Sequence, residues 1–246
     1  MPQPLPLVIA HRGASASAPE NTLEAFRQAF DRFKVDMIEF DVHISKDGVP
    51  VILHDARLER TTAGKGYVSK YAASELKIFN IPTLEEVFEA FPGKSFAIEV
   101  KENSAELTRT VMGLVNKFKA GPRVIVGSKH HAVFEEMRKN FPGVPRFASQ
   151  RVVIAAIVDF KRGVKNPSED PLTAASIPVE RLGFRLDQER LIRYFHRKKM
   201  RLFFWTINDA LSMKALWARG ADGIITNHPA LLNQVLGRCG TDPTTV

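Results

Sequence analysis

Short apolar runs recur along the chain, and stretches in which apolar residues return every three or four positions separate most of them. The short runs are rich in β-branched and aromatic residues, as buried strands are, whereas the longer spacing is typical of helices with one apolar face. Strands that alternate with helices pack into a parallel sheet. The predicted strands are residues 7–12, 37–42, 95–101, 123–128, 145–149, 181–185, 201–207 and 223–226. The predicted helices are residues 21–33, 83–91, 105–118, 131–140, a weakly defined segment after 150, and residues 188–198, 209–219 and 230–236.

The number of predicted strands favours a closed barrel. Eight strands, each followed by a helix, form a (β/α)8 TIM barrel most naturally, whereas a doubly wound open sheet usually has fewer strands and often a glycine-rich first turn. No such glycine pattern follows the first predicted strand. A chain of 246 residues with 44% hydrophobic residues can fill one core of this size. We therefore expect a single barrel domain across residues 1–246.

One region interrupts the alternation of strands and helices. Residues 43–82 contain the turn Lys46-Asp47-Gly48 and then a second extended run, residues 50–55. An Asp-Gly turn between extended runs is typical of a hairpin. We interpret residues 43–82 as an insertion, a hairpin and loop that follow the second strand at the carboxyl-terminal face of the barrel, where a lid would lie.

The formal net charge of +8 favours an anionic partner, such as a phosphate ester, a nucleic acid or an acidic membrane surface. Lys and Arg are scattered and no nucleic-acid-binding motif is present, so we expect no nucleic acid partner. No apolar stretch approaches the length of a membrane span, so we expect no stable membrane insertion. The single cysteine, Cys239, allows no intrachain disulfide, and the opening residues do not match a signal peptide. These features predict a cytoplasmic protein.

Acidic side chains lie at the ends of two predicted strands, where a βα barrel carries its reactive groups. Glu39 and Asp41 are two positions apart on one strand and share a face, as do Glu99 and Lys101 on the next strand. Three bare carboxylates would repel one another, whereas a hard divalent cation binds such oxygens well. We therefore predict a Mg²⁺ or Ca²⁺ site at Glu39, Asp41 and Glu99, and the choice between the two ions stays open.

Two histidines are predicted to lie on either side of this cation. His11 ends the first predicted strand, and a hairpin at Asp47-Gly48 would bring His54 back to the level of Asp41. Histidine titrates near neutral pH, so one imidazole can deprotonate an attacking water or hydroxyl while the other protonates the leaving alkoxide. Which histidine is the base stays open, as does the choice between direct attack by water and a cyclic phosphate.

A series of motifs in a fixed order resembles the glycerophosphodiester phosphodiesterase family. Together they span nearly the whole chain, although any one alone is weak. The motifs are His11-Arg12-Gly13, Pro19-Glu20-Asn21-Thr22, Glu39-Phe40-Asp41-Val42, Ser45-Lys46-Asp47-Gly48, Pro50-Val51-Ile52-Leu53-His54-Asp55, Ile81-Pro82-Thr83-Leu84-Glu85-Glu86, Glu99-Val100-Lys101, Trp205-Thr206-Ile207-Asn208 and Gly220-Ala221-Asp222-Gly223-Ile224-Ile225-Thr226. No family motif is matched between about residues 130 and 187.

The resemblance implies a barrel that hydrolyses a small-molecule glycerophosphodiester to glycerol 3-phosphate and an alcohol with the help of a divalent metal. It implies metal ligands at Glu39, Asp41 and Glu99, an acid–base pair at His11 and His54, phosphate contacts from Arg12 and Lys101, and a glycerol contact from Trp205. A buried barrel aromatic explains Trp205 nearly as well. For His43, a hairpin residue near the site is favoured over a further ligand.

Two other functions are weighed against this one. A lysophospholipase D would use the same chemistry on lysophospholipids, but it needs an apolar groove for an acyl chain. The insertion offers only Ile78, Phe79 and Ile81, and no helix typical of a membrane surface stands out. A non-enzymatic barrel that binds nucleic acid is supported by charge alone. The densest basic run, residues 193–201, is expected to be a solvated face at a helix end, where positive charge suits the helix dipole.

Overall fold

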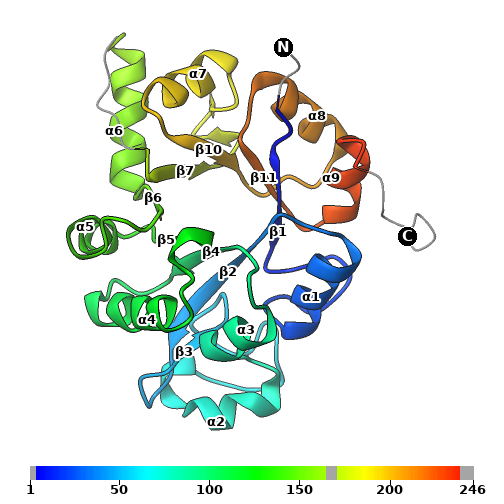
Figure 1. The fold of residues 1–246 in the computed structure, drawn as a ribbon, viewed down its shortest axis with the longest axis vertical. Helices are drawn as coiled ribbons and strands as arrows, with labels where there is room; N and C mark the ends of the chain where they lie inside the picture. Colours follow the sequence, from blue (N-terminus) through cyan, green and yellow to red (C-terminus); the bar gives the residue numbers. More distant parts are fainter. Residues whose placement is uncertain (1–3, 165–170, 239–246) are drawn as a thin grey trace.

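The structure is a computed structural model that describes residues 4–164 and 171–238, so Cys239 lies outside the described residues. Within these ranges, eight parallel strands pair in a ring, and helices surround them (Figure 1). The ring closes because β1 pairs with both β2 and β11, which confirms the predicted (β/α)8 barrel. In the order in which they pair around the ring, the strands are β1 (Leu7–His11), β2 (Met37–Ile44), β4 (Phe96–Val100), β5 (Val124–Gly127), β6 (Arg146–Phe147), β7 (Thr173–Ile177), β10 (Arg201–Phe204) and β11 (Gly223–Thr226).

The helices follow the predicted order around the barrel. The first predicted helix is divided, because a π-helical turn, η1 (Gln28–Arg32), continues α1. None of the helices in the described ranges has the length and apolarity needed to cross a membrane. The α-helices are α1 (Leu23–Arg27), α2 (Ala73–Leu76), α3 (Leu84–Ala90), α4 (Ala105–Lys117), α5 (His131–Asn140), α6 (Gln150–Lys161), α7 (Glu189–Arg197), α8 (Ala210–Arg219) and α9 (Pro229–Val235). The 3-10 helices are η2 (Val68–Lys70), η3 (Lys77–Phe79) and η4 (Gly121–Arg123).

The interior of the barrel is filled by a cluster of side chains to which each strand contributes. Side chains alternate between the two faces of a strand, so the neighbours of each interior residue pack outward against the helices. In β1, for example, Ile9 belongs to the interior cluster, whereas Val8 and Ala10 belong to the larger outer cluster. The interior cluster consists of Ile9, Met37, Ala97, Ile125, Ala174, Phe203 and Ile225, with Phe147 packed against it.

A hairpin follows the second strand. The strand β3 (Pro50–Ile52) pairs antiparallel with the end of β2, and Val42 lies opposite Ile52. The rest of the insertion buries a small apolar cluster of its own, which includes Leu58 and Leu76. The hairpin is therefore held from both sides, by the barrel and by this cluster.

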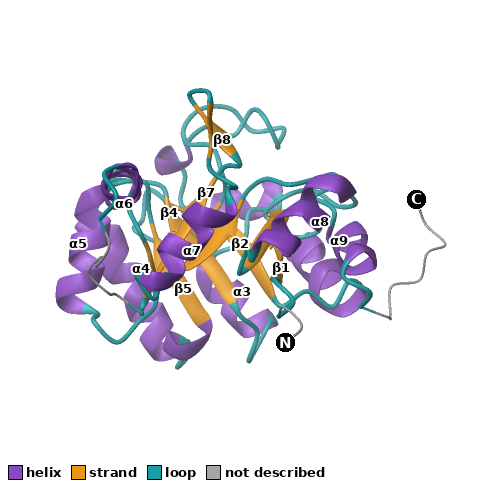
Figure 2. Cartoon of the chain, turned by 90° about the horizontal axis from the view of Figure 1, so that it is seen from above, coloured by secondary structure: helices purple, strands orange, loops and turns teal. Residues whose placement is uncertain are grey.

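The prediction for the sixth strand was wrong. Residues 181–185 were predicted to form it, but β7 (Thr173–Ile177) occupies that place between β6 and β10. The predicted segment contains β8 (Glu180–Arg181) and β9 (Phe184–Arg185), which form a separate two-stranded hairpin with exposed side chains. The hairpin rises above the barrel strands in Figure 2. The sequence of β7, Thr-Ala-Ala-Ser-Ile, consists mostly of small residues, so it lacks the apolar signal of the other strands.

Candidate active site

The barrel interior explains why the candidate residues meet. Apart from Arg12 and His54, each lies one or two steps of two residues beyond an interior residue of its own strand, so it faces the same side at the carboxyl-terminal end. His11 follows Ile9 in this way, Glu99 follows Ala97, and Trp205 follows Phe203. One cavity of about 610 Å³ is lined by every predicted site residue, namely His11, Arg12, Glu39, Asp41, His54, Glu99, Lys101 and Trp205.

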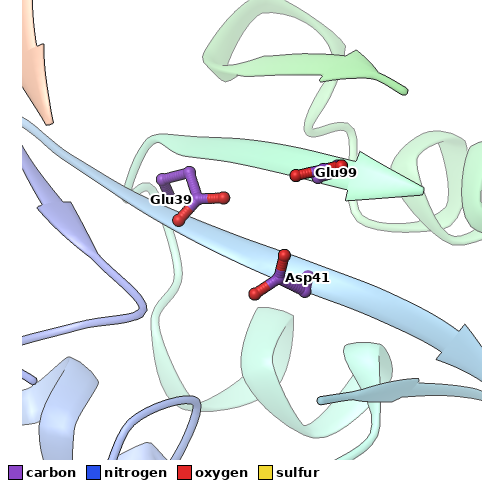
Figure 3. A group of neighbouring side chains, drawn as sticks. All are labelled: Glu39, Asp41 and Glu99. Atoms are coloured by element: carbon purple, nitrogen blue, oxygen red, sulfur yellow. The ribbon is translucent and has the colours of Figure 1, made fainter. Parts of the chain in front are cut away.

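Three carboxylates converge at the floor of this cavity. Glu39 and Asp41 come from β2 and Glu99 from the adjacent strand β4, and Figure 3 shows all three on the same side of these strands. One oxygen of each lies within 4.8 Å of the others. Burial, and then the charges of Asp41 and Glu99, raise the pKa of Glu39 well above its usual value. Three ionised carboxylates this close together require a compensating positive charge.

A second observation also indicates that these three carboxylates fit a divalent cation. Oε2 of Glu39 is buried and accepts no hydrogen bond from any residue that the structure describes. A buried acceptor without a donor is costly unless a ligand completes it. Carboxylate oxygens are the ligands that Mg²⁺ and Ca²⁺ prefer.

Basic side chains partly balance the acids. Nζ of Lys101 lies 3.2 Å from Oδ1 of Asp41 and 3.4 Å from Oε1 of Glu99. Burial lowers the pKa of Lys101, but the charges of Asp41 and Glu99 outweigh burial, so the pKa is raised and the lysine stays charged. On the other side of Asp41, Nε of Arg12 lies 3.3 Å from Oδ2, and Nδ2 of Asn21 donates to the same oxygen at 3.1 Å. Asp41 is thus held from two directions.

Asn227 fixes the orientation of His11. Oδ1 of Asn227 accepts a hydrogen bond from the Ser15 hydroxyl at 3.1 Å and lies 2.7 Å from Nδ1 of His11. An amide oxygen only accepts, so Nδ1 carries the proton in this contact, and Nε2 of the neutral ring is left with its lone pair. Nε2 lies 3.9 Å from Oε2 of Glu39, at the carboxylate cluster. Burial, and then the charge of Arg12, lower the pKa of His11, which favours this neutral form.

The hairpin brings His54 to the site as predicted. The backbone N–H of Leu53 donates to the carbonyl of Asp41 at 3.1 Å, which fixes the next residue at the level of the carboxylates. Nδ1 of His54 lies 2.6 Å from Oδ1 of Asp55. His43 lies beside the site, where its Nε2 donates to the carbonyl of His54 at 3.1 Å, in agreement with its predicted place in the hairpin. Its Nδ1 lies 2.6 Å from Oε1 of Glu102.

An ion-pair chain joins the two histidine-bearing segments, and little in the sequence pointed to it. Arg60 binds Asp55 and also donates to Glu20 at 2.7 and 3.0 Å. Glu20 in turn accepts from Arg12 at 2.9 Å. Glu20 belongs to a family-like motif without an assigned role, whereas Arg60 lies in no motif. Sequence reasoning also missed Asn227, although it directly follows the last motif. Asn208 ends another motif, and its Oδ1 accepts from the backbone N–H of Asn227 at 2.9 Å.

One wall of the cavity is apolar. Val153, Ile154 and Ile157 of α6 line it, together with Leu186. Trp205, which is 45% exposed, lines the same cavity. This wall lies in the segment for which no family motif is matched, so the sequence provided no expectation for it. The cavity therefore combines a charged floor with a hydrocarbon side.

Known proteins are similar to this chain over more than nine-tenths of its length. A glycerophosphodiester phosphodiesterase of Caldanaerobacter subterraneus is 29% identical over 252 residues, which cover 95% of this chain and 99% of the relative. Rat lysophospholipase D GDPD1 is 26% identical, over 93% of this chain and 85% of its own. An Oleispira antarctica phosphodiesterase, solved in complex with the product sn-glycerol-3-phosphate, has a TM-score of 0.76 at 23% identity and covers 95% of this chain and 97% of its own.

The family comparison covers the segment that carries the site. The model of the glycerophosphoryl diester phosphodiesterase family matches residues 11–231, from the first histidine of the site to the last helix. The match includes all the motifs and every strand from β2 to β11. The chain therefore belongs to the glycerophosphoryl diester phosphodiesterase family, and its barrel mouth brings together acidic, basic and imidazole side chains.

Proposed function

We propose that this chain hydrolyses glycerophosphodiesters to glycerol 3-phosphate and an alcohol, with Mg²⁺ or Ca²⁺ held by Glu39, Asp41 and Glu99. The observation that carries the proposal is the carboxylate cluster, in which one oxygen of each residue lies within 4.8 Å of the others. In this cluster, the buried Oε2 of Glu39 accepts no hydrogen bond from the described residues. When bound, a divalent cation polarises a phosphoryl oxygen and offsets the charge that develops in the transition state. The relatives named as glycerophosphodiester phosphodiesterases support this reaction class.

The histidines supply the proton transfers. His11 and His54 each have Nδ1 against an oxygen acceptor, Asn227 and Asp55 respectively, so Nε2 is the nitrogen left for substrate. A neutral Nε2 accepts the proton of an attacking water or hydroxyl, and a protonated one donates to the leaving alkoxide. Because the two rings come from β1 and from the hairpin, they can act on different sides of one phosphorus atom.

The cations and the tryptophan bind the substrate. Arg12 and Lys101 already lie beside Asp41, so a phosphodiester next to the metal would meet both positive side chains. Their charge stabilises the equatorial oxygens as the bond to the leaving group breaks. Trp205 would contact the glycerol group, since it lines the same cavity and is partly exposed.

The test is release of glycerol 3-phosphate from glycerophosphocholine and from glycerophosphoethanolamine. Protein stripped of metal by a chelator is compared with the same protein after addition of Mg²⁺ or Ca²⁺. We expect turnover that chelation abolishes and that one of these ions restores. Absence of turnover with every head group and both ions would reject the proposed reaction, and turnover that is indifferent to chelation would reject the metal site.

A second candidate substrate is a lysophospholipid, and the wall of α6 is the observation that favours it. The predicted source of an acyl groove was the insertion, but Ile78 is 78% exposed there, and the apolar lining of the cavity comes instead from α6. The similarity to a lysophospholipase D supports the same reading. Lysophosphatidylcholine and glycerophosphocholine should be compared at equal concentration. A higher kcat/KM for the acylated substrate, lost in Ile157→Ser, would support this candidate, and a lower one would exclude it.

A further inference from the structure

The helix α6 and the hairpin β8–β9 expose apolar side chains to an unusual degree. Of the twelve residues of α6, only Ala156 is buried, although residues 152–158, Val-Val-Ile-Ala-Ala-Ile-Val, are all apolar. Ile154 is 48% exposed and Val158 is 38% exposed. A helix at the rim of a barrel normally turns its apolar residues inward and its polar residues toward water. The exposed face of α6 thus carries Ile154 and Val158 in addition to the apolar residues that pack inward, which water alone would not favour.

The hairpin adds two more apolar residues at its tip. Leu182 is 91% exposed and Phe184 is 55% exposed. Leu182 also has a φ of 50°, and with Gly183 at 76° it forms a tight turn in which Asn or Gly is the usual choice. A leucine in this left-handed conformation is strained, and its side chain gains nothing in water. An apolar residue at such a tip is stabilised only when another surface covers it and removes it from water.

Cations surround these apolar residues. Arg151 and Arg162 lie on the same face of α6 as Val158, because they are spaced at seven and four residues from it. Nζ of Lys161 lies 3.3 Å from the centre of the Phe184 ring, which places the hairpin against the helix. Within residues 150–164 and 179–186 there are five basic and only two acidic side chains. The surface is therefore apolar at its centre and positive around it.

We propose that this surface, formed by the exposed face of α6 and the tip of β8–β9, docks on a lipid bilayer that carries anionic headgroups. Exposed apolar side chains next to Lys and Arg are the combination that binds such bilayers, because hydrocarbon enters the interface while the cations meet the headgroups. A second copy of the chain is a poor occupant, since it would bring a like positive charge. Docking is peripheral, because no described helix could cross the membrane.

The position of the surface ties docking to the cavity. Ile154 lines the cavity and is also part of the exposed face, and Arg181 of the hairpin lines the cavity as well. Figure 2 shows the hairpin projecting beyond the end of the barrel strands, so a bilayer that receives its tip lies over the mouth. A lipid-derived substrate could then enter the site from the interface. The docking proposal itself does not depend on the proposed reaction.

The experiment is sedimentation of the full chain with vesicles, which requires no turnover. Vesicles of phosphatidylcholine alone are compared with vesicles of equal parts phosphatidylcholine and phosphatidylglycerol. We expect binding to the anionic vesicles that weakens at high salt. The double variant Leu182→Ser/Phe184→Ser should bind about tenfold or more weakly, because two side chains no longer enter the interface. The matched control is Ile78→Ser/Leu211→Ser, which removes two other exposed apolar residues and should bind as the native chain does.

A second variant keeps the test independent of the hairpin. Arg151→Glu/Arg162→Glu should lose binding to anionic vesicles, and circular dichroism should show native helix content for all variants. The proposal is overturned if the native chain does not bind anionic vesicles, or if Leu182→Ser/Phe184→Ser binds them as well as Ile78→Ser/Leu211→Ser does. It is also overturned if the chain self-associates in sedimentation experiments through Leu182 and Phe184 without binding vesicles, since the surface would then belong to a second copy.

Discussion

The mouth of the barrel has two unlike sides. On the side of β1, β2 and β4, the side chains are polar or charged, and most have a defined partner. Asp41, for example, is held by Arg12, Asn21 and Lys101. Across the ring, between β6 and β7, the helix α6 presents hydrocarbon to the cavity and to the outside. The contrast indicates that one side carries the groups for the reaction, whereas the other forms an apolar environment for the substrate.

The largest effects are expected on the charged side. His11→Ala and His54→Ala should each lower kcat by about 10²–10⁴-fold, because each removes a proton-transfer group. His130→Ala is the matched control, since His130 precedes α5 and does not line the cavity. Glycerol 3-phosphate release measures the effect, and circular dichroism checks the fold. Near-normal turnover in either variant would remove that histidine from the proposed pair.

A smaller effect is expected from the residue that orients His11. Asn227→Ala should lower kcat/KM by about 10–100-fold, as the loss of an orienting partner usually does. The pH profile of kcat/KM should also change, because the ring tautomer is no longer fixed, and Asn227→Asp should restore part of the rate by accepting the same N–H. Asn116→Ala, on the exposed face of α4, serves as the control. An unchanged pH profile would mean that Asn227 acts only on the fold.

The two sides should also differ in stability. Met112→Ala on α4 should lower the free energy of unfolding by about 2–5 kcal/mol, because Met112 is fully buried. Ile154→Ala on α6 should change it by no more than about 0.5 kcal/mol, because Ile154 is 48% exposed. Urea unfolding of both variants tests the difference. Equal losses would show that α6 is packed like an ordinary barrel helix and would weaken the contrast between the two sides.

The smallest effect concerns His196 on α7, whose Nε2 lies 2.8 Å from Oδ2 of Asp222. The hydrogen bond to Asp222 raises the pKa of His196 above its ordinary value. A pKa that is higher in the folded state gives stability that is full below about pH 6.5 and is lost as the pH rises through the folded-state value. The pair is partly exposed, so we expect less than about 1 kcal/mol. Urea unfolding from about pH 5.5 to pH 8.5 should show this loss in the native chain and in His228→Gln, but not in His196→Gln.

The charged side could be predicted from the sequence because its signals are local. The strands β1, β2 and β4 consist of apolar and β-branched runs, and the site residues follow them at steps of two, so periodicity alone places Glu39, Asp41 and Glu99 on one face. The return of His54 also followed from a local signal, the turn at Asp47-Gly48. Short spacing and strand alternation therefore sufficed for the carboxylates and the hairpin.

The other side, and the long-range contacts of the charged side, could not be predicted, each for a physical reason. The small residues of β7 gave no strand signal, while Leu182 and Phe184 resembled a buried strand although they are exposed. In addition, contacts between distant residues leave no local pattern. Asn227 is 216 positions from His11, and Arg60 is 40 positions from Glu20, so neither partnership could be inferred without the fold.

The measurement that tests the central claim most directly is calorimetric titration of Mg²⁺ and of Ca²⁺ into protein freed of metal. We expect one binding event per chain for at least one ion. Binding should be lost in Glu39→Gln and retained in Glu106→Gln, which changes a carboxylate in the first turn of α4. Absence of binding by both ions, or undiminished binding in Glu39→Gln, would contradict the proposal that the three carboxylates hold a cation.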